Sequence, residues 1–315
     1  MLRSIKSITS DPLTYLESTW AEFGDVVQFP IPKPATYLIT SPEGAREVLV
    51  NQHNETSKRT LQYNNLSLVT GEGLLTADTQ AWRPRRRMLQ PAFHKEMIAL
   101  SEHHIAAGLA KLDNQWAELT SVGPAIVDID HAMMSLALEI TCGALFGIEV
   151  DDDVDEITAA TLTALHGVVA RARNPISLPL SIPTPANLKM KRAIKRLDKA
   201  VDAILISREL NQLPDQAPIR DMLDVLLDPD LETPLTKQQI RDEIVTFIVA
   251  GHETVASALT WAWHLLVTNP VGSFQSPYHF FTSGSPTVTV TPNLSACSGA
   301  NSTLTASGAT TYSWA

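Results

Sequence analysis

Apolar residues recur at steps of three and four along most of the first 268 residues, which is the spacing of one face of an α-helix. The pattern predicts helices most clearly at about 12–23, 80–90, 95–119, 128–146, 153–173 and 186–212. Two short stretches, "DVVQFPIP" and "ATYLITS", instead predict strands with a proline-containing turn between them. The expected fold class is therefore mainly α with a small N-terminal β element.

The longest apolar segment follows a helix-start signal. Thr236 and Gln239 have the spacing of a capping box, and no helix breaker occurs before Pro270. We expect one continuous helix from about 236 to 268, which is about 48 Å long at 1.5 Å per residue. A membrane span is the alternative, but Glu253 at its centre would cost about 2.5–3.5 kcal/mol there. A central helix buried in a helical core is the better interpretation.

A polar triplet interrupts this helix in the stretch "FIVAGHETVASALTW". Ala250 and Gly251 remove side-chain bulk, which lets another group approach the backbone closely. Thr254 lies on nearly the same face and can bond back to a carbonyl of the preceding turn, so we expect a local distortion near Ala250 and Gly251. Together with Glu253, these residues suit a proton-delivery site beside a bulky ligand. The alternative is a core helix whose His252 and Glu253 simply reach polar neighbours.

Charge and cysteine content narrow the class of protein. The formal net charge of −10 argues against non-specific binding to nucleic acid or to anionic lipid. Two cysteines cannot form a disulfide framework or a zinc constellation, and no metal ligand is predicted. The N-terminal stretch "MLRSIKSITSDPLTYL" lacks the apolar region of a secretory signal. We expect a cytoplasmic protein with no membrane segment and no nucleic-acid partner.

The composition changes near Pro270. No Asp, Glu, Lys or Arg occurs after Glu253, and residues 271–315 are rich in Ser, Thr, Gly and Pro. We expect residues 1–270 to form one part of the protein. Residues 271–315 are predicted to be a foreign tail, extended or disordered.

Two motifs resemble those of the cytochrome P450 haem-thiolate monooxygenases. "AGHET" matches the A-G-x-[DE]-T pattern of that family's long central helix. "GEGLLTADTQAWRPRRRMLQPAFH", from Gly71 to His94, resembles the segment around its W-x-x-x-R helix, with Trp82 and Arg86 as the matching pair. An indole N–H and a guanidinium can jointly bind a carboxylate, although a Trp–Arg stacking pair on a surface helix is the alternative. Pro84 departs from a helical motif unless the helix starts close to Trp82.

The resemblance extends in order over residues 11–270, because "DPLTYLESTWAEFGDVVQF", "YLITSPEGAREVL" and "MSLALEITCGALFG" are similar to further parts of the family. It implies a haem cofactor and the oxidation of a lipophilic small molecule by O₂. Electrons would come from a ferredoxin or a flavoprotein. In such an enzyme Thr254 and Glu253 would be catalytic and would manage proton delivery. Ala250 and Gly251 would leave room for O₂, and Trp82 and Arg86 would hold the haem.

The family's proximal motif is absent from these 315 residues. The pattern F-x-x-G-x-R-x-C-x-G does not occur, only Gly299 agrees with it around Cys297, and Cys142 sits in an apolar helical run. The family's downstream E-x-x-R pair is also missing. We therefore expect a truncated P450 fold without its axial thiolate, joined to unrelated sequence and not a working monooxygenase as it stands. The alternative is a non-enzymatic helical binding protein or a surface-module fusion.

Overall fold

The structure is a computed structural model that describes residues 8, 10–29, 35–148, 154–173, 178–210, 221–231, 233–268, 287–290 and 304–306. The described residues up to Ser57 form one compact unit, and those from Lys58 onward form a second. The predicted join near Pro270 and most of the predicted tail lie outside the described residues. The tail prediction therefore stays a prediction.

The N-terminal unit contains the predicted β element. Helix α2 (Pro12–Phe23) begins at Asp11, whose carboxylate accepts a hydrogen bond from the Thr14 N–H at 3.2 Å. Strand β1 (Val26–Gln28) then pairs antiparallel with β2 (Tyr37–Ile39), and α3 (Pro42–Arg46) starts at the Ser41 cap. The π-helical turn η1 (Glu47–Asn51) continues α3. These elements confirm the predicted helix and strand pair.

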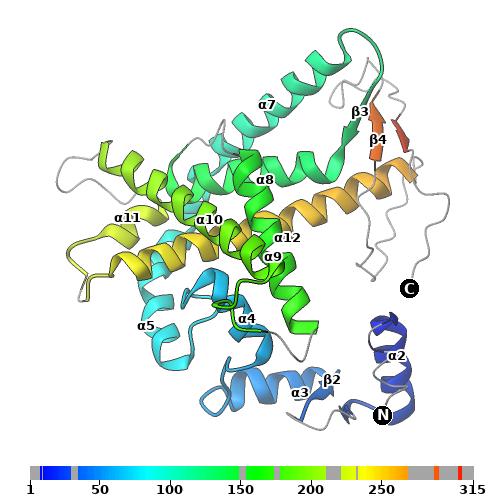
Figure 1. The fold of residues 1–315 in the computed structure, drawn as a ribbon, viewed down its shortest axis with the longest axis vertical. Helices are drawn as coiled ribbons and strands as arrows, with labels where there is room; N and C mark the ends of the chain where they lie inside the picture. Colours follow the sequence, from blue (N-terminus) through cyan, green and yellow to red (C-terminus); the bar gives the residue numbers. More distant parts are fainter. Residues whose placement is uncertain are drawn as a thin grey trace. The chain divides into compact units, whose positions relative to one another are not determined.

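The second unit holds most of the helices (Figure 1). In chain order they are α4 (Leu61–Thr70), α5 (Thr79–Leu89), the 3₁₀ turn η2 (Gln90–Phe93), α6 (Lys95–Leu100), α7 (Glu102–Thr120), α8 (Ile129–Phe146), α9 (Val154–Arg173), α10 (Pro185–Leu210), α11 (Met222–Leu227) and α12 (Lys237–Thr268). The predicted helix over 95–119 is two helices, because the chain turns at Ser101, whose N–H bonds to the Ile98 carbonyl at 3.0 Å. The mainly α prediction is confirmed.

A second small sheet lies at one end of α12. Strand β3 (Ala125–Asp128) pairs antiparallel with β4 (Thr287–Val290), and β4 pairs with β5 (Leu304–Ala306). The sequence pattern did not predict β3, since four residues are too few for a clear alternation.

Helix α12 is the continuous 32-residue helix that the sequence predicts. The Gln239 N–H donates to the Thr236 hydroxyl at 3.3 Å, and the Thr236 N–H donates to the Gln239 side chain at 2.9 Å, so the capping box is formed. All of its residues are α-helical, and the expected distortion near Ala250 is not visible as a break or a change of helix type.

Two hydrophobic clusters hold α12 in place. The larger joins its first half to α4, α8, α9, α10 and α11, with Phe146, Leu197, Leu223, Ile244 and Ile248 fully buried. The smaller joins its second half to α7 and α8. By length and composition α8 and α12 could each cross a membrane, but about half of each is buried inside the protein, as in the core helices of a globular fold.

Candidate functional site

Thr254 and Ala250 lie on an exposed strip of helix α12. Both residues are exposed, whereas Ile248, Val249 and His252 beside them are buried. The Thr254 hydroxyl donates to the Ala250 carbonyl at 2.7 Å, which is the bond back to the preceding turn that the sequence indicated. The structure therefore brings these two predicted site residues together on one open face.

Gly251 points elsewhere, toward α8. A Cβ atom at this position would lie 2.8 Å from the Thr141 hydroxyl oxygen and 2.9 Å from the Thr141 methyl group. Close packing of α12 on α8 is by itself a sufficient reason for glycine here. Its predicted role in leaving room for O₂ stays a prediction.

Glu253 is half-buried, and burial raises the pKa of its carboxyl group. The charge of His166 on α9 opposes this rise, and the carboxylate of Asp130 on α8 adds to it. A carboxyl group with a raised pKa keeps its proton closer to neutral pH, which suits a proton carrier. The environment of Glu253 therefore fits the catalytic role that the sequence predicts.

His252 is fully buried between α12 and α8. Burial lowers its pKa to about 4, against the opposing effects of the Met134 backbone and the Asp130 carboxylate. Within the described part of the chain, neither ring nitrogen makes a hydrogen bond of normal geometry. His252 is therefore a neutral core residue. Its polar neighbours, the Met134 backbone and the Asp130 carboxylate, interact with it only weakly.

Trp82 and Arg86 stack on one face of α5. The Arg86 guanidinium lies 5.3 Å from the centre of the Trp82 ring, and the Lys58 ammonium lies 5.7 Å from the same ring. Arg86 is exposed and Trp82 is partly buried. The helix starts at Thr79, so Pro84 lies inside it and removes one backbone hydrogen bond without ending it. The pair is thus formed and leaves its cation accessible to an anionic group.

Sequence reasoning missed the neighbouring Arg85, which is buried. Its guanidinium lies 3.1 Å from the carboxylate of Glu243 on α12, and it also donates to the Glu72 carbonyl. Glu243 accepts a hydrogen bond from the Leu74 N–H at 2.9 Å. Burial raises the pKa of Glu243, although Arg85 and Leu74 oppose the rise. The loop 71–75 and helix α5 are therefore tied to the central helix by charge as well as by packing.

Two glycines in the stretch "GEGLL" allow that loop to reach α12. Gly71 has a φ of 60°, and a Cβ there would overlap the Asp242 carboxylate at 2.1 Å. A Cβ on Gly73 would overlap the Thr246 hydroxyl oxygen at 2.1 Å and the Asp242 carbonyl oxygen at 2.5 Å. The carboxylate of Asp242 also accepts a hydrogen bond from the Glu72 N–H at 3.0 Å. The sequence does not reveal this contact, because the two segments lie about 170 residues apart along the chain.

The described residues fit the edge of a haem but not its axial position. Arg86 offers an exposed guanidinium for a carboxylate, and the strip around Thr254 offers an open face. Cys142, however, is 0% exposed inside the main hydrophobic cluster, and burial raises the pKa of its thiol to about 12. A thiol in that environment does not supply a thiolate. Cys297 lies outside the described residues.

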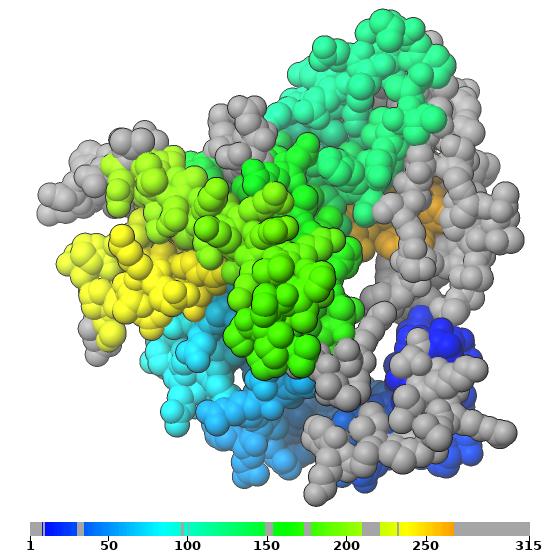
Figure 2. Space-filling view, in the orientation of Figure 1, coloured from blue at the N-terminus to red at the C-terminus, as the bar shows by residue number. Residues whose placement is uncertain are grey.

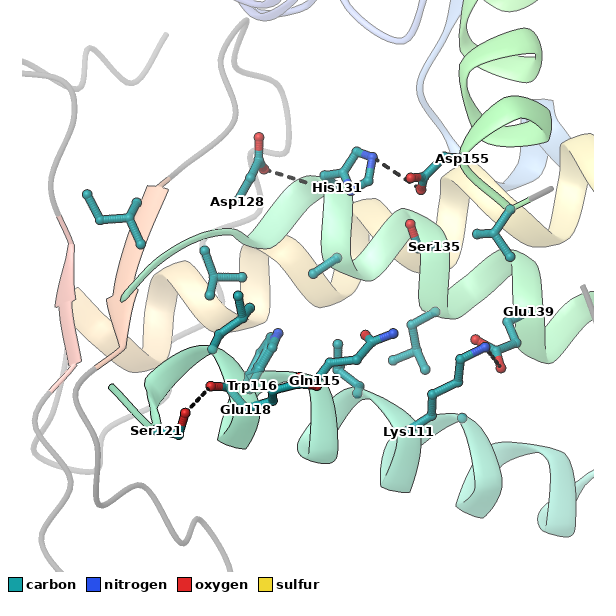
Figure 3. Close-up of a pocket in the computed structure, with 18 of the residues that line it drawn as sticks. Lys111, Gln115, Trp116, Glu118, Ser121, Asp128, His131, Ser135, Glu139 and Asp155 are labelled. Carbon is teal, nitrogen blue, oxygen red and sulfur yellow. Dashed lines mark hydrogen bonds and ion pairs between the residues drawn. The ribbon is translucent and has the colours of Figure 1, made fainter. Parts of the chain in front are cut away.

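A separate groove of about 930 Å³ lies between α7 and α8, away from the predicted site residues (Figure 3). Figure 3 shows Lys111 and Glu139 reaching toward one another along its wall, where their charged atoms are 3.0 Å apart. Trp116 lines the groove and packs against Trp263 of α12, with ring centres 5.5 Å apart. None of the residues predicted to be catalytic or to bind haem lines this groove.

The fold class and the two motifs agree with the comparison with known proteins. The family model for cytochrome P450 matches residues 4–271, and this chain belongs to that family. The matched range includes the whole of α5 and of α12, with both motifs.

Similar proteins occur in Streptomyces. Cyclooctatin synthase of Streptomyces melanosporofaciens is 30% identical over 260 residues, which is 82% of this chain and 55% of that protein. Cyclooctat-9-en-7-ol 5-monooxygenase of the same organism is 31% identical, with the same coverage of both chains. Pentalenene oxygenase of Streptomyces avermitilis is 29% identical over 82% of this chain and 56% of that protein. The chain therefore spans about half the length of these relatives.

Proposed function

We propose that residues 58–268 supply one wall of a haem pocket in a monooxygenase that oxidises a lipophilic small molecule with O₂. The observation that carries the proposal is the open strip of α12, where Ala250 and Thr254 are exposed although Ile248, Val249 and His252 beside them are buried. A buried helix exposes such a strip where a further group packs against it. The motif resemblance and the monooxygenase relatives support haem as that group.

Proton handling is the role assigned to Glu253 and Thr254. The raised pKa of Glu253 lets its carboxyl group hold a proton closer to neutral pH and release it to an acceptor. The Thr254 hydroxyl donates to the Ala250 carbonyl, so its lone pairs remain free to accept a hydrogen bond from a water molecule. Haem, when bound, supplies the activation of O₂. The chain supplies an acid and a hydroxyl on adjacent positions of one helix.

Binding of the cofactor's carboxylates is the role assigned to Trp82 and Arg86. The stacked ring holds the Arg86 side chain in one orientation, which reduces the entropy lost on binding an anion. Arg85 has a positioning role, since its ion pair with Glu243 fixes α5 on the central helix.

The substrate class and the electron donor follow from the relatives. The names of two relatives contain cyclooctat-9-en-7-ol and pentalenene, and both of these molecules are mostly hydrocarbon. We propose a lipophilic substrate for this protein, a ferredoxin or flavoprotein as electron donor, and a cytoplasmic location.

These 315 residues are proposed to be inactive alone, because neither the sequence motif nor Cys142 provides an axial thiolate. The test is a haem titration of the purified chain, followed by the absorption spectrum of the reduced, carbon-monoxide-bound form. We expect weak haem binding without the red-shifted Soret band of a thiolate ligand. That band would overturn the proposed inactivity, and Cys142→Ser and Cys297→Ser variants would identify the ligand.

A second arm tests the proposed haem contacts. Arg86→Gln should weaken haem binding by at least about ten-fold, since a charge-assisted hydrogen bond contributes about 1.5–3 kcal/mol. Arg87→Gln is the matched control, because Arg87 is an exposed neighbour on the same helix. Equal affinity in all three proteins would count against the assigned contact. No haem binding at all would favour a non-enzymatic helical protein.

A further inference from the structure

Strand β4 comes from a part of the chain that the proposed haem chemistry does not use. The match to the cytochrome P450 family ends at residue 271, and both β4 and β5 follow that point in the sequence. The two strands nevertheless join β3, which lies inside the matched range, in one antiparallel sheet of order β3-β4-β5. Figure 1 shows β4 beside β3 near one end of α12. One sheet therefore combines residues from inside and outside the family match.

Strand β3 is held in place on one side and offers an edge to a second strand. Val127 is only 7% exposed and belongs to the smaller hydrophobic cluster, as does Val267 of α12. Ile126, the preceding residue, is 68% exposed. Within the part of the chain that the structure describes, β4 is the strand that pairs with β3. A strand fixed in this way presents N–H and C=O groups that an added strand can pair.

The register of the ladder matches the alternation of Val and Thr in β4. The buried Val127 lies opposite Val288, and the exposed Ile126 lies opposite Thr289. The other two pairs are Ala125 with Val290 and Asp128 with Thr287. Residues directly opposite one another share a face of an antiparallel sheet, and a slip by one residue would set a threonine opposite Val127. The hydrophobic pattern therefore favours the register that is observed.

Strand β5 continues the same pattern. Its two apolar residues lie opposite the valines of β4, and its threonine lies opposite a threonine. The pairs are Leu304 with Val290, Thr305 with Thr289 and Ala306 with Val288. A pattern that holds across three strands from distant parts of the chain supports a specific sheet.

The composition of the tail also favours strand addition. No charged residue follows Glu253, so no charge in the tail opposes pairing with a strand edge. Val and Thr are β-branched residues, which favour extended backbone. Prolines occur at 286 and 292, on either side of β4, and proline has no N–H to donate to a ladder. The sequence therefore specifies a short strand between two stops.

We propose that the edge of β3 is a docking site for an uncharged strand of alternating Val and Thr, and that residues 287–290 of the same chain are its occupant. Strand β4 contacts α8 and β5 contacts α12, so the two tail strands connect these helices at the sheet. Figure 2 shows the C-terminal half of α12, in orange, at the surface. Ile126 and Val127 also line the groove between α7 and α8, so the docked strand stabilises one end of that groove. This role is independent of haem binding.

Disulfide trapping in the full chain tests both the docking and its register. In a Cys297→Ser background, Ile126→Cys/Thr289→Cys places two thiols at directly opposite positions, where Cα atoms are about 4.5–5.5 Å apart and a disulfide can form. Oxidation should give a disulfide within one chain, seen as a mobility shift on a non-reducing gel that a reductant abolishes. Ile126→Cys/Val290→Cys is the matched control, because its thiols belong to opposite faces of the sheet and should not crosslink.

Hydrogen exchange gives a second measurement on a chain without added cysteines. Strand β4 pairs on both of its sides, so Thr289→Pro removes an N–H from the ladder. Backbone amides of residues 125–128 should then exchange faster than in the parent chain. Ser283→Pro changes the tail before β4 and should leave this exchange as it is.

Four results would overturn the proposal. They are no crosslink in the Thr289 pair, equal crosslinking in both pairs, a disulfide between two chains, and unchanged exchange at β3 in Thr289→Pro. A disulfide between two chains would show that the occupant of the β3 edge is a second copy of the protein.

Discussion

Arg85 on α5 and Glu243 on α12 form an ion pair with 3.1 Å between their charged atoms, and their side chains are only 8% and 0% exposed. A pair this deeply buried costs desolvation energy when it forms, and it costs more when one partner is removed. It joins the helix of Trp82 and Arg86 to the helix of Glu253 and Thr254. The two halves of the candidate site are therefore connected through one charged contact.

Removal of one partner of this pair should destabilise the protein more than removal of both. We expect Glu243→Leu to lower the free energy of unfolding by about 3–5 kcal/mol, because Arg85 remains buried without its counter-charge. The double variant Arg85→Leu/Glu243→Leu should lose less than Glu243→Leu alone, because no unpaired charge stays buried. Urea unfolding of the four proteins measures the coupling, and additive losses would show that the pair has no specific role.

Replacement of Gly251 by Ala should test the packing of α12 on α8. The new methyl group would overlap Thr141, at a cost of about 1–3 kcal/mol, which exceeds the gain of about 1 kcal/mol in helix propensity. Thr141→Ala in the same chain removes the overlapping atoms and should restore most of the loss. Thermal unfolding followed by circular dichroism gives the comparison. If the Gly251→Ala variant is as stable as the parent chain, the close contact is disproved.

Gly73→Ala should be more damaging than Gly251→Ala. The added Cβ would meet the backbone carbonyl of Asp242 as well as the Thr246 side chain, and backbone cannot rotate away. We expect the loop 71–75 to detach from α12 and to become open to proteolysis. Limited proteolysis followed by mass spectrometry locates the cleavage. Protection equal to that of the parent chain would contradict the expected detachment.

His252 should make the protein sensitive to mild acid. Its pKa is about 4 in the folded state against 6.5 for the free side chain, so the unfolded chain binds the extra proton between these values. The contribution of neutral His252 to the free energy of unfolding is therefore fully present above pH 6.5. It falls as the pH is lowered, by about 2 kcal/mol at pH 5. Urea unfolding at several pH values measures this slope. His252→Leu should flatten it, and an unchanged slope would assign the effect to other groups.

The sequence alone determined those features of the helices that depend on residues close together in the chain. The capping box of Thr236 and Gln239 starts α12, and the absence of a breaker keeps α12 continuous. The motifs around Trp82 and Thr254 also identified the family before any contact was known. Each of these signals lies within a few residues, so the chain shows it without folding.

The tertiary structure decided which way the side chains point and what they meet. Only folding placed Gly251 against Thr141, Thr254 on the open strip, and Arg85 opposite Glu243, about 160 residues along the chain. It also buried Cys142, whose thiol pKa rises to about 12, and His252, whose pKa falls to about 4. The physical reason is that desolvation and ion pairing depend on neighbours brought together by packing. A local sequence pattern does not contain those neighbours.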